Sequence, residues 1–65
     1  MKNRIKELRK ELGLRQEDMA AQLGVTRQTI NAIENDKYNP TLELAMKIAK
    51  RLELPVEQIF LLEEP

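Results

Sequence analysis

Residues 16–35, QEDMAAQLGVTRQTINAIEN, decide the fold of this chain. Apolar residues recur in this stretch at helical spacing, in one set of Met19, Ala20 and Leu23 and a second set of Ile30 and Ile33. Gly24 lies between the two sets. Just past the end of a helix, glycine readily adopts a left-handed backbone conformation that costs other residues roughly 1 kcal/mol. The stretch therefore predicts two helices joined by a tight turn at Gly24.

The residues around the turn support this prediction. A very short turn brings the two helix axes close together, and Ala20 supplies the small side chain that the first helix needs where the second crosses it. After the turn, we expect Val25 to point into the core and the hydroxyl of Thr26 to cap the second helix.

The second helix carries polar side chains outside its apolar stripe. Side chains of these types can bond the edges of DNA bases or the oxygens of phosphates: Arg27, Gln28, Thr29 and Asn31. A solvated polar surface is the more usual reason for such residues on a helix, and it stays open as an alternative at this point.

Most of the chain resembles a known family. The similar stretches are ELGLRQEDMAAQLGVTRQTINAIENDK (11–37), NPTLELAMKIAKRL (39–52) and VEQIF (56–60). They resemble the phage-repressor-type helix-turn-helix transcriptional regulators, the Cro/C1 or XRE-like family. Within that family, the chain is similar to short single-domain repressors without a separate sensor domain.

The resemblance implies an all-α, five-helix, repressor-like fold. It places one DNA-binding domain over residues 1–65, with the helix-turn-helix at residues 16–35. It also leaves open a short terminal β-pair, in which Leu61 and Leu62 lie beside Met1 and Lys2.

The resemblance further implies binding of double-stranded DNA. The contact residues that it implies are Gln16, Thr26, Arg27, Gln28, Thr29, Asn31, Asn35, Lys37 and Tyr38. Gln16 begins the first motif helix, where its amide and the free backbone N–H groups would face a phosphate. Asn35 and Lys37 lie where the family holds phosphates. The hydroxyl of Tyr38 could reach a phosphate or a partner subunit, and simple packing of its ring is an equal alternative.

Three further positions carry expectations from the family. Arg9 is expected to pair with Glu34, with an ordinary surface arginine as the alternative. Arg15 stands where the family commonly has a serine or threonine cap, whose loss costs roughly 1 kcal/mol. The acidic residues of the first turn recover part of that loss through the helix dipole. Glu53 stands where the family usually has glycine, so a left-handed backbone there would be strained.

The flanking segments predict the remaining elements. Residues 3–12 form an amphipathic helix, capped by Asn3, whose apolar side is Ile5, Leu8 and Leu12. Residues 35–40 are a loop, because polar turn formers precede a proline. Thr41 caps a buried helix over 42–52, whose apolar stripe is Leu42, Ala45, Ile48, Ala49 and Leu52. Pro55 starts a short helical turn over 56–60.

Composition excludes several classes of function. The chain has 65 residues, so we expect one domain with a marginally stable core. It has no cysteine and no histidine, so no disulfide, metal site, cofactor or enzymatic constellation is expected. No apolar run approaches the ~20 residues needed to span a bilayer, and no signal peptide opens the chain. We therefore expect a cytoplasmic protein without a membrane partner or a small-molecule ligand.

The net charge is zero, which by itself argues against a nucleic-acid partner. The distribution of charge along the chain partly answers this objection. Residues 1–37 hold eight basic and six acidic residues, a net of +2, and the remainder is therefore −2. We expect modest general affinity for DNA and a reliance on specific contacts and on a doubled site.

The C-terminal apolar residues predict a homodimer. Their number is larger than one side of a single helical turn can bury. These residues are Val56, Ile59, Phe60, Leu61 and Leu62. A two-fold axis there would match an inverted-repeat operator. An antitoxin-like protein and a protein-interaction module using the same helical fold remain alternatives to this repressor-like regulator.

Overall fold

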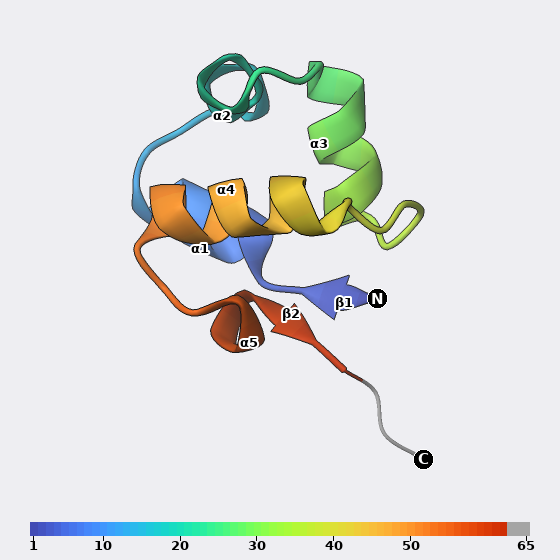
Figure 1. The fold of residues 1–65 in the computed structure, drawn as a ribbon. Coiled ribbons are helices and arrows are strands. Elements are labelled where there is room, and N and C mark those ends of the chain that lie inside the picture. Colours follow the sequence, from blue (N-terminus) through green and yellow to red (C-terminus); the bar gives the residue numbers. More distant parts are fainter. Residues whose placement is uncertain (63–65) are drawn as a thin grey trace.

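The computed structural model describes residues 1–62 as a set of short helices with one small sheet (Figure 1). In chain order the elements are β1 (Lys2–Asn3), α1 (Ile5–Glu11), α2 (Gln16–Leu23), α3 (Arg27–Glu34), α4 (Leu42–Leu52), α5 (Val56–Ile59) and β2 (Phe60–Leu61). This order confirms the predicted five helices and a terminal β-pair. The strands are Lys2–Asn3 and Phe60–Leu61 rather than Met1–Lys2 and Leu61–Leu62, because the last helix ends at Ile59 and Phe60 already belongs to β2.

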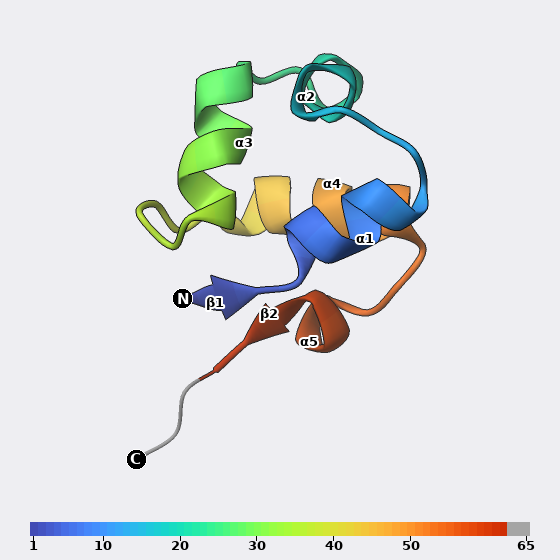
Figure 2. The same cartoon turned by 180° about the vertical axis from the view of Figure 1, so that it is seen from behind.

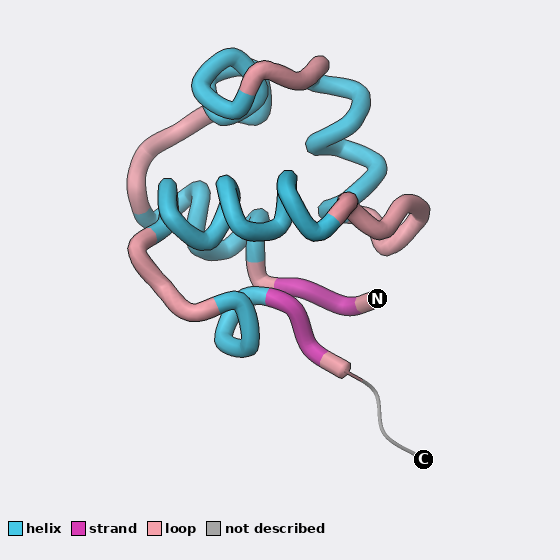
Figure 3. The backbone as a smooth tube through the Cα atoms, viewed as in Figure 1, coloured by secondary structure: helices cyan, strands magenta, loops and turns pink. Residues whose placement is uncertain are grey.

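The helices surround one core. Helices α1 and α4 cross the middle of the molecule, with α4 in front of α1 in Figure 1 and behind it in the reverse view of Figure 2. Helices α2 and α3 form the upper part, and the loop after α3 projects beside the N-terminus, as the tube in Figure 3 shows. There the N-terminal amine donates to Oδ1 of Asn39 over 3.1 Å.

The two strands join the ends of the described chain. They pair antiparallel, with Lys2 opposite Leu61 and Asn3 opposite Phe60. Asn3 lies in β1 rather than in a helix, because α1 begins at Ile5 and not at residue 3. Its Oδ1 nevertheless accepts from the Ile5 N–H over 3.1 Å, and its Nδ2 donates to the Ile33 carbonyl over 2.8 Å. Asn3 thus binds the first N–H of α1, whose N-cap position is Arg4, and its side chain also connects β1 to the end of α3.

Every helix contributes to the core. Its most deeply buried large side chains are Ile5, Met19, Ile30, Ile33, Ile48 and Ile59. Two predicted core residues are exposed instead. Leu12 is 51% exposed because α1 ends at Glu11. Leu42 is 75% exposed, since it lies roughly 100° around α4 from the centre of the buried face, which Leu44 helps to form.

The predicted caps and turns are present. Thr26 and Thr41 accept from the backbone N–H groups of Thr29 and Leu44, each over 3.2 Å. Gly24 has a φ of +73° at the end of α2, so the turn uses the conformation for which glycine is suited. Glu53 takes the corresponding left-handed conformation after α4, with a φ of +57°.

Candidate nucleic-acid interface

The first turn of α3 presents two unengaged polar side chains. Arg27 and Gln28 are its first two residues, and both are exposed. Within residues 1–62, neither side chain forms a hydrogen bond or an ion pair. Thr26 and Thr29 are engaged with each other instead, because their hydroxyl oxygens lie 3.1 Å apart beside the cap. Arg27 and Gln28 are therefore the side chains of this turn that can bond a ligand without breaking an internal contact.

Helix α2 brings a further amide to this surface. Gln16, the first residue of α2, lines one shallow hollow together with Arg27, Gln28 and Asn31. Four of the nine predicted contact residues therefore meet in one place, although Gln16 is eleven positions from the nearest of the others in the sequence.

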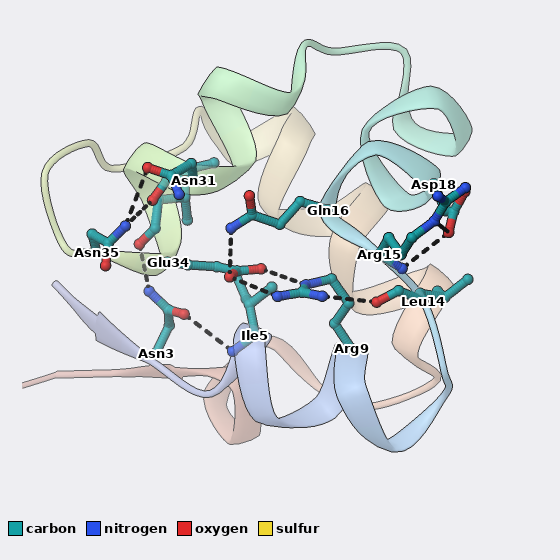
Figure 4. A network of polar contacts seen from close by, with 11 residues as sticks. Asn3, Ile5, Arg9, Leu14, Arg15, Gln16, Asp18, Asn31, Glu34 and Asn35 are labelled. Atoms are coloured by element: carbon teal, nitrogen blue, oxygen red, sulfur yellow. Dashed lines mark hydrogen bonds and ion pairs between the residues drawn. The ribbon is translucent and has the colours of Figure 1, made fainter.

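The side chain of Gln16 is hydrogen-bonded to Glu34, which forms an ion pair with Arg9, as Figure 4 shows. Its Nε2 donates to Oε1 of Glu34 over 3.1 Å. The same carboxylate accepts from Nε of Arg9 over 2.8 Å and from its Nη2 over 3.1 Å. Arg9 completes its bonding by donating from Nη1 to the Leu14 carbonyl over 2.8 Å. The predicted pairing of Arg9 with Glu34 is confirmed. The sequence did not predict the hydrogen bond that Gln16 donates to Glu34.

The ion pair is enclosed by the protein. The side chains of Arg9 and Glu34 are 8% and 2% exposed. Hydrogen bonding to Glu34 raises the pKa of Arg9 above its ordinary value, against the lowering effect of burial. Arg9 therefore keeps its charge, and Glu34 connects the core to the amide that faces the hollow.

The loop after α3 carries the remaining predicted contacts. Nδ2 of Asn35 donates to the carbonyl and to Oδ1 of Asn31, over 2.9 and 3.2 Å, so Asn35 is tied to the end of α3. Lys37 and Tyr38 are exposed, and neither side chain has a polar partner within residues 1–62. Both residues lie in the loop between α3 and α4.

The beginning of α2 replaces the missing cap in a different way. The carboxylate of Asp18 accepts from the backbone N–H of Arg15 over 3.0 Å and from its guanidinium over 3.1 Å. Both interactions lower the pKa of Asp18, and the side-chain bond has the larger effect. The N-terminus of α2, and with it Gln16, is thus fixed without a serine or threonine.

The residues of the predicted dimer surface are distributed between core and surface. Ile59 is fully buried and Phe60 is 8% exposed within the protomer. Val56 is half-buried, and only Leu61 and Leu62 are exposed, at 40% and 75%. Pairing of β2 with β1 turns Phe60 onto the core, so Ile59 and Phe60 add little exposed area.

Comparison with known proteins matches this geometry. Residues 5–59 match the family model described as "Helix-turn-helix". The chain belongs to the helix-turn-helix family. It is 53% identical over 64 residues to an uncharacterized regulator of this type from Methanocaldococcus jannaschii, covering 98% of this chain and 97% of that one. It is 50% identical over 64 residues to the regulator YgzD of Bacillus subtilis, with the same coverage of 98% and 97%.

Solved structures agree with the family assignment. The restriction-modification controller protein C.AhdI from Aeromonas hydrophila superposes with a TM-score of 0.78 and 32% identity, over 88% of this chain and 83% of that one. A hypothetical transcription factor from Neisseria gives 0.74 and 30%, over 83% and 62%. The chain is thus a helix-turn-helix transcriptional regulator, a class without enzymatic activity. Among residues 1–62, no helix of this regulator is both long and apolar enough to cross a membrane.

Proposed function

We propose that this regulator binds a specific double-stranded DNA site as a homodimer and represses transcription by covering a promoter. The observation that carries the proposal is the pair Arg27 and Gln28, exposed and unengaged at the start of α3. In helix-turn-helix proteins, this end of the second helix enters the major groove. Arginine can bond guanine through two hydrogen bonds, and glutamine can bond adenine in the same way.

Other observations support the parts of this proposal. Gln16 lines the same hollow as Arg27 and Gln28, and Lys37 and Tyr38 are exposed in the loop that follows α3. Phosphate contacts from these three residues would fix the register of α3 on the duplex. The stretches TRQTINAIE (26–34) and KYNP (37–40) also resemble the small regulator of the enterococcal cytolysin operon, which favours a repressor role. The relatives above come from bacteria and archaea, whose DNA lies in the cytoplasm, and we place this regulator there.

A homodimer would raise the affinity of this regulator for DNA. The net charge is zero, so general attraction to DNA is weak. One recognition helix reads only a few base pairs, and two helices related by a two-fold axis would read an inverted repeat with half-sites about 34 Å apart. The exposed Leu61 and Leu62, beside Met1, supply apolar surface for the pairing.

Selection of sites from a random DNA pool, followed by mobility-shift titration over a salt series, tests the proposal. We expect Arg27→Ala and Gln28→Ala each to cost about 1–3 kcal/mol on the selected site and to relax the preference at one or two base pairs. Lys6→Ala, on the exposed side of α1, is the matched control and should retain full affinity. Equal losses on selected and random DNA would show that both residues contact only phosphates.

The same titration separates the alternatives. Binding to DNA should weaken steeply as salt rises, because phosphate contacts release counterions. If no DNA is retained even at low salt, the proposed DNA binding is wrong and the protein-interaction module becomes the leading alternative.

A further inference from the structure

A second exposed apolar surface lies on α4. Leu42 and Met46 are 75% and 59% exposed, and they line one hollow together with Glu43, Lys47 and Lys50. We call these five residues the α4 face. The exposure of Leu42 and Met46, and the burial of Ala45 and Ile48 on the same helix, place this face on the side of α4 that is turned away from the core.

The charges beside this apolar pair are mainly positive. Lys47 and Lys50 also border a neighbouring hollow with Arg51, whose side chain bonds Gln22. Glu43 is the one acid in the sequence of α4, and its carboxylate lies 3.9 Å from Nζ of Lys47. Lys50 has no ion-pair partner within residues 1–62. A segment that fits the α4 face therefore combines apolar side chains with acidic ones.

The same chain contains such a segment at residues 61–64, Leu-Leu-Glu-Glu. Leu61 and Leu62 are exposed, while Glu63 and Glu64 lie outside the described residues. A stable dimer needs about 800 Å² from each partner, roughly a sixth of the 4635 Å² that this chain exposes. The interface must therefore extend well past one two-residue strand.

We propose that the α4 face of one protomer receives residues 61–64 of a second copy. This inference rests on the proposed homodimer and assigns its contact surfaces. Around a two-fold axis each protomer would both give and receive a segment, so the contact occurs twice. The two leucines cover Leu42 and Met46. The two glutamates face Lys47 and Lys50.

Charge argues against the simpler arrangement in which the two C-terminal segments pack on each other. That arrangement would bring Glu63 and Glu64 of both copies together across the axis, and juxtaposed like charges cost several kcal/mol. Docking on the α4 face places the same carboxylates beside lysines. Neither Arg27 nor Gln28 belongs to the α4 face, so the contact uses neither residue proposed to read DNA.

Charge reversal on each side of the proposed contact tests it. One variant is Lys47→Glu/Lys50→Glu and the other is Glu63→Lys/Glu64→Lys. In either variant alone, both contacts of a homodimer become repulsive, so we expect the dimer dissociation constant to rise at least about tenfold. In an equimolar mixture of the two variants, both contacts become complementary again, and a heterodimer should form. The control Lys6→Glu/Lys10→Glu reverses two exposed lysines of α1 and should dimerise as the wild type does.

Sedimentation velocity, with circular dichroism to confirm helical content, distinguishes the outcomes. Monomeric single variants that recover a heterodimer on mixing support the proposal. A mixture that remains monomeric overturns it. If the wild type and both variants dimerise equally well, the α4 face is not the docking site and the homodimer stands. A wild type that is a folded monomer overturns the homodimer itself.

Discussion

Glu34 connects the interior of the protein with the surface proposed for DNA. Its carboxylate accepts two hydrogen bonds from Arg9 and one from Gln16, at an exposure of 2%. Loss of Glu34 would leave an arginine charge enclosed without its partner and would release the amide of Gln16. A single buried residue can therefore affect both stability and DNA affinity.

The Arg9–Glu34 pair should show strong coupling in a double-mutant cycle. We expect Arg9→Met or Glu34→Leu to destabilise the fold by roughly 3–5 kcal/mol, because each leaves a buried charge unpaired. The double variant should cost much less than the sum. Urea unfolding of the four proteins measures the coupling. The exposed Arg4–Glu7 pair, at 2.8 Å, is the control and should couple by only about 0–1 kcal/mol. A buried pair that couples no more strongly than this control would contradict the prediction.

Glu53 stores backbone strain at the end of α4. Its φ of +57° costs a residue with a Cβ roughly 1–2 kcal/mol, and glycine removes this cost. Glycine also adds roughly 0.5–1 kcal/mol of entropy to the unfolded chain, so Glu53→Gly should stabilise by about 0.5–1 kcal/mol net. Asp36, with a φ of +60°, is the comparison, and Asp36→Gly should gain less because aspartate tolerates this region. The free energy of unfolding in urea decides whether Glu53→Gly is the more stable protein.

At the scale of the elements, α2 is the helix whose start departs most from the family pattern. Arg15 occupies the cap position and has no hydroxyl to accept from an N–H of the first turn. The carboxylate of Asp18 instead accepts from the backbone N–H of Arg15 itself. The interaction depends on a carboxylate, so the stability of this end of α2 depends on pH.

The pH dependence has a definite sign. Arg15 lowers the pKa of Asp18 in the folded state below the ordinary value of 3.8. The stabilisation is therefore present above pH 3.8 and is lost as pH falls through the lower folded value. Asp18→Asn should be less stable than wild type at neutral pH, and the gap should close below pH 3.8. Urea unfolding across that range measures it. Glu11→Gln, which removes an exposed carboxylate, should match the wild type at neutral pH.

Sequence reasoning succeeded for elements whose signals are local. Periodicity located the helices, and the left-handed position of Gly24 and the caps at Thr26 and Thr41 follow from residue chemistry alone. It failed for Leu12, because α1 ends one residue earlier, and for Leu42, because the buried face of α4 is centred on other residues of that helix. The same limit applies to the site, since no local pattern could reveal that Gln16 bonds Glu34.

The C-terminal residues show the same limit at the other end of the chain. Counting five apolar residues at 56–62 treats them as one surplus. The structure divides them, because a strand of two residues is too short to show an alternating pattern in the sequence, yet its pairing with β1 decides which side chain faces the core.

For the molecule as a whole, two exposed apolar surfaces and one polar surface lie on different elements. The apolar ones are at the C-terminal strand and on α4, and the polar one is at the start of α3. The longest dimension of the protomer is 35 Å. One protomer presents one copy of the α3 surface, so the proposed reading of two half-sites about 34 Å apart would require a second copy.

The C-terminal apolar residues differ in burial, so the same substitution at a buried and at an exposed position should have different effects. Ile59 is fully buried, so Ile59→Asp places a charge in the core and should unfold the protomer. Leu62 is 75% exposed, so Leu62→Asp should retain helical content, sediment as a monomer at micromolar concentration and lose binding to the inverted repeat. Circular dichroism, sedimentation and footprinting on the selected site report these three properties separately. Dimerisation can bury only the apolar surface that the protomer leaves exposed, and Leu62 belongs to that surface. A Leu62→Asp variant that remains dimeric would therefore contradict the proposed pairing. A wild-type footprint without inverted symmetry would contradict it as well.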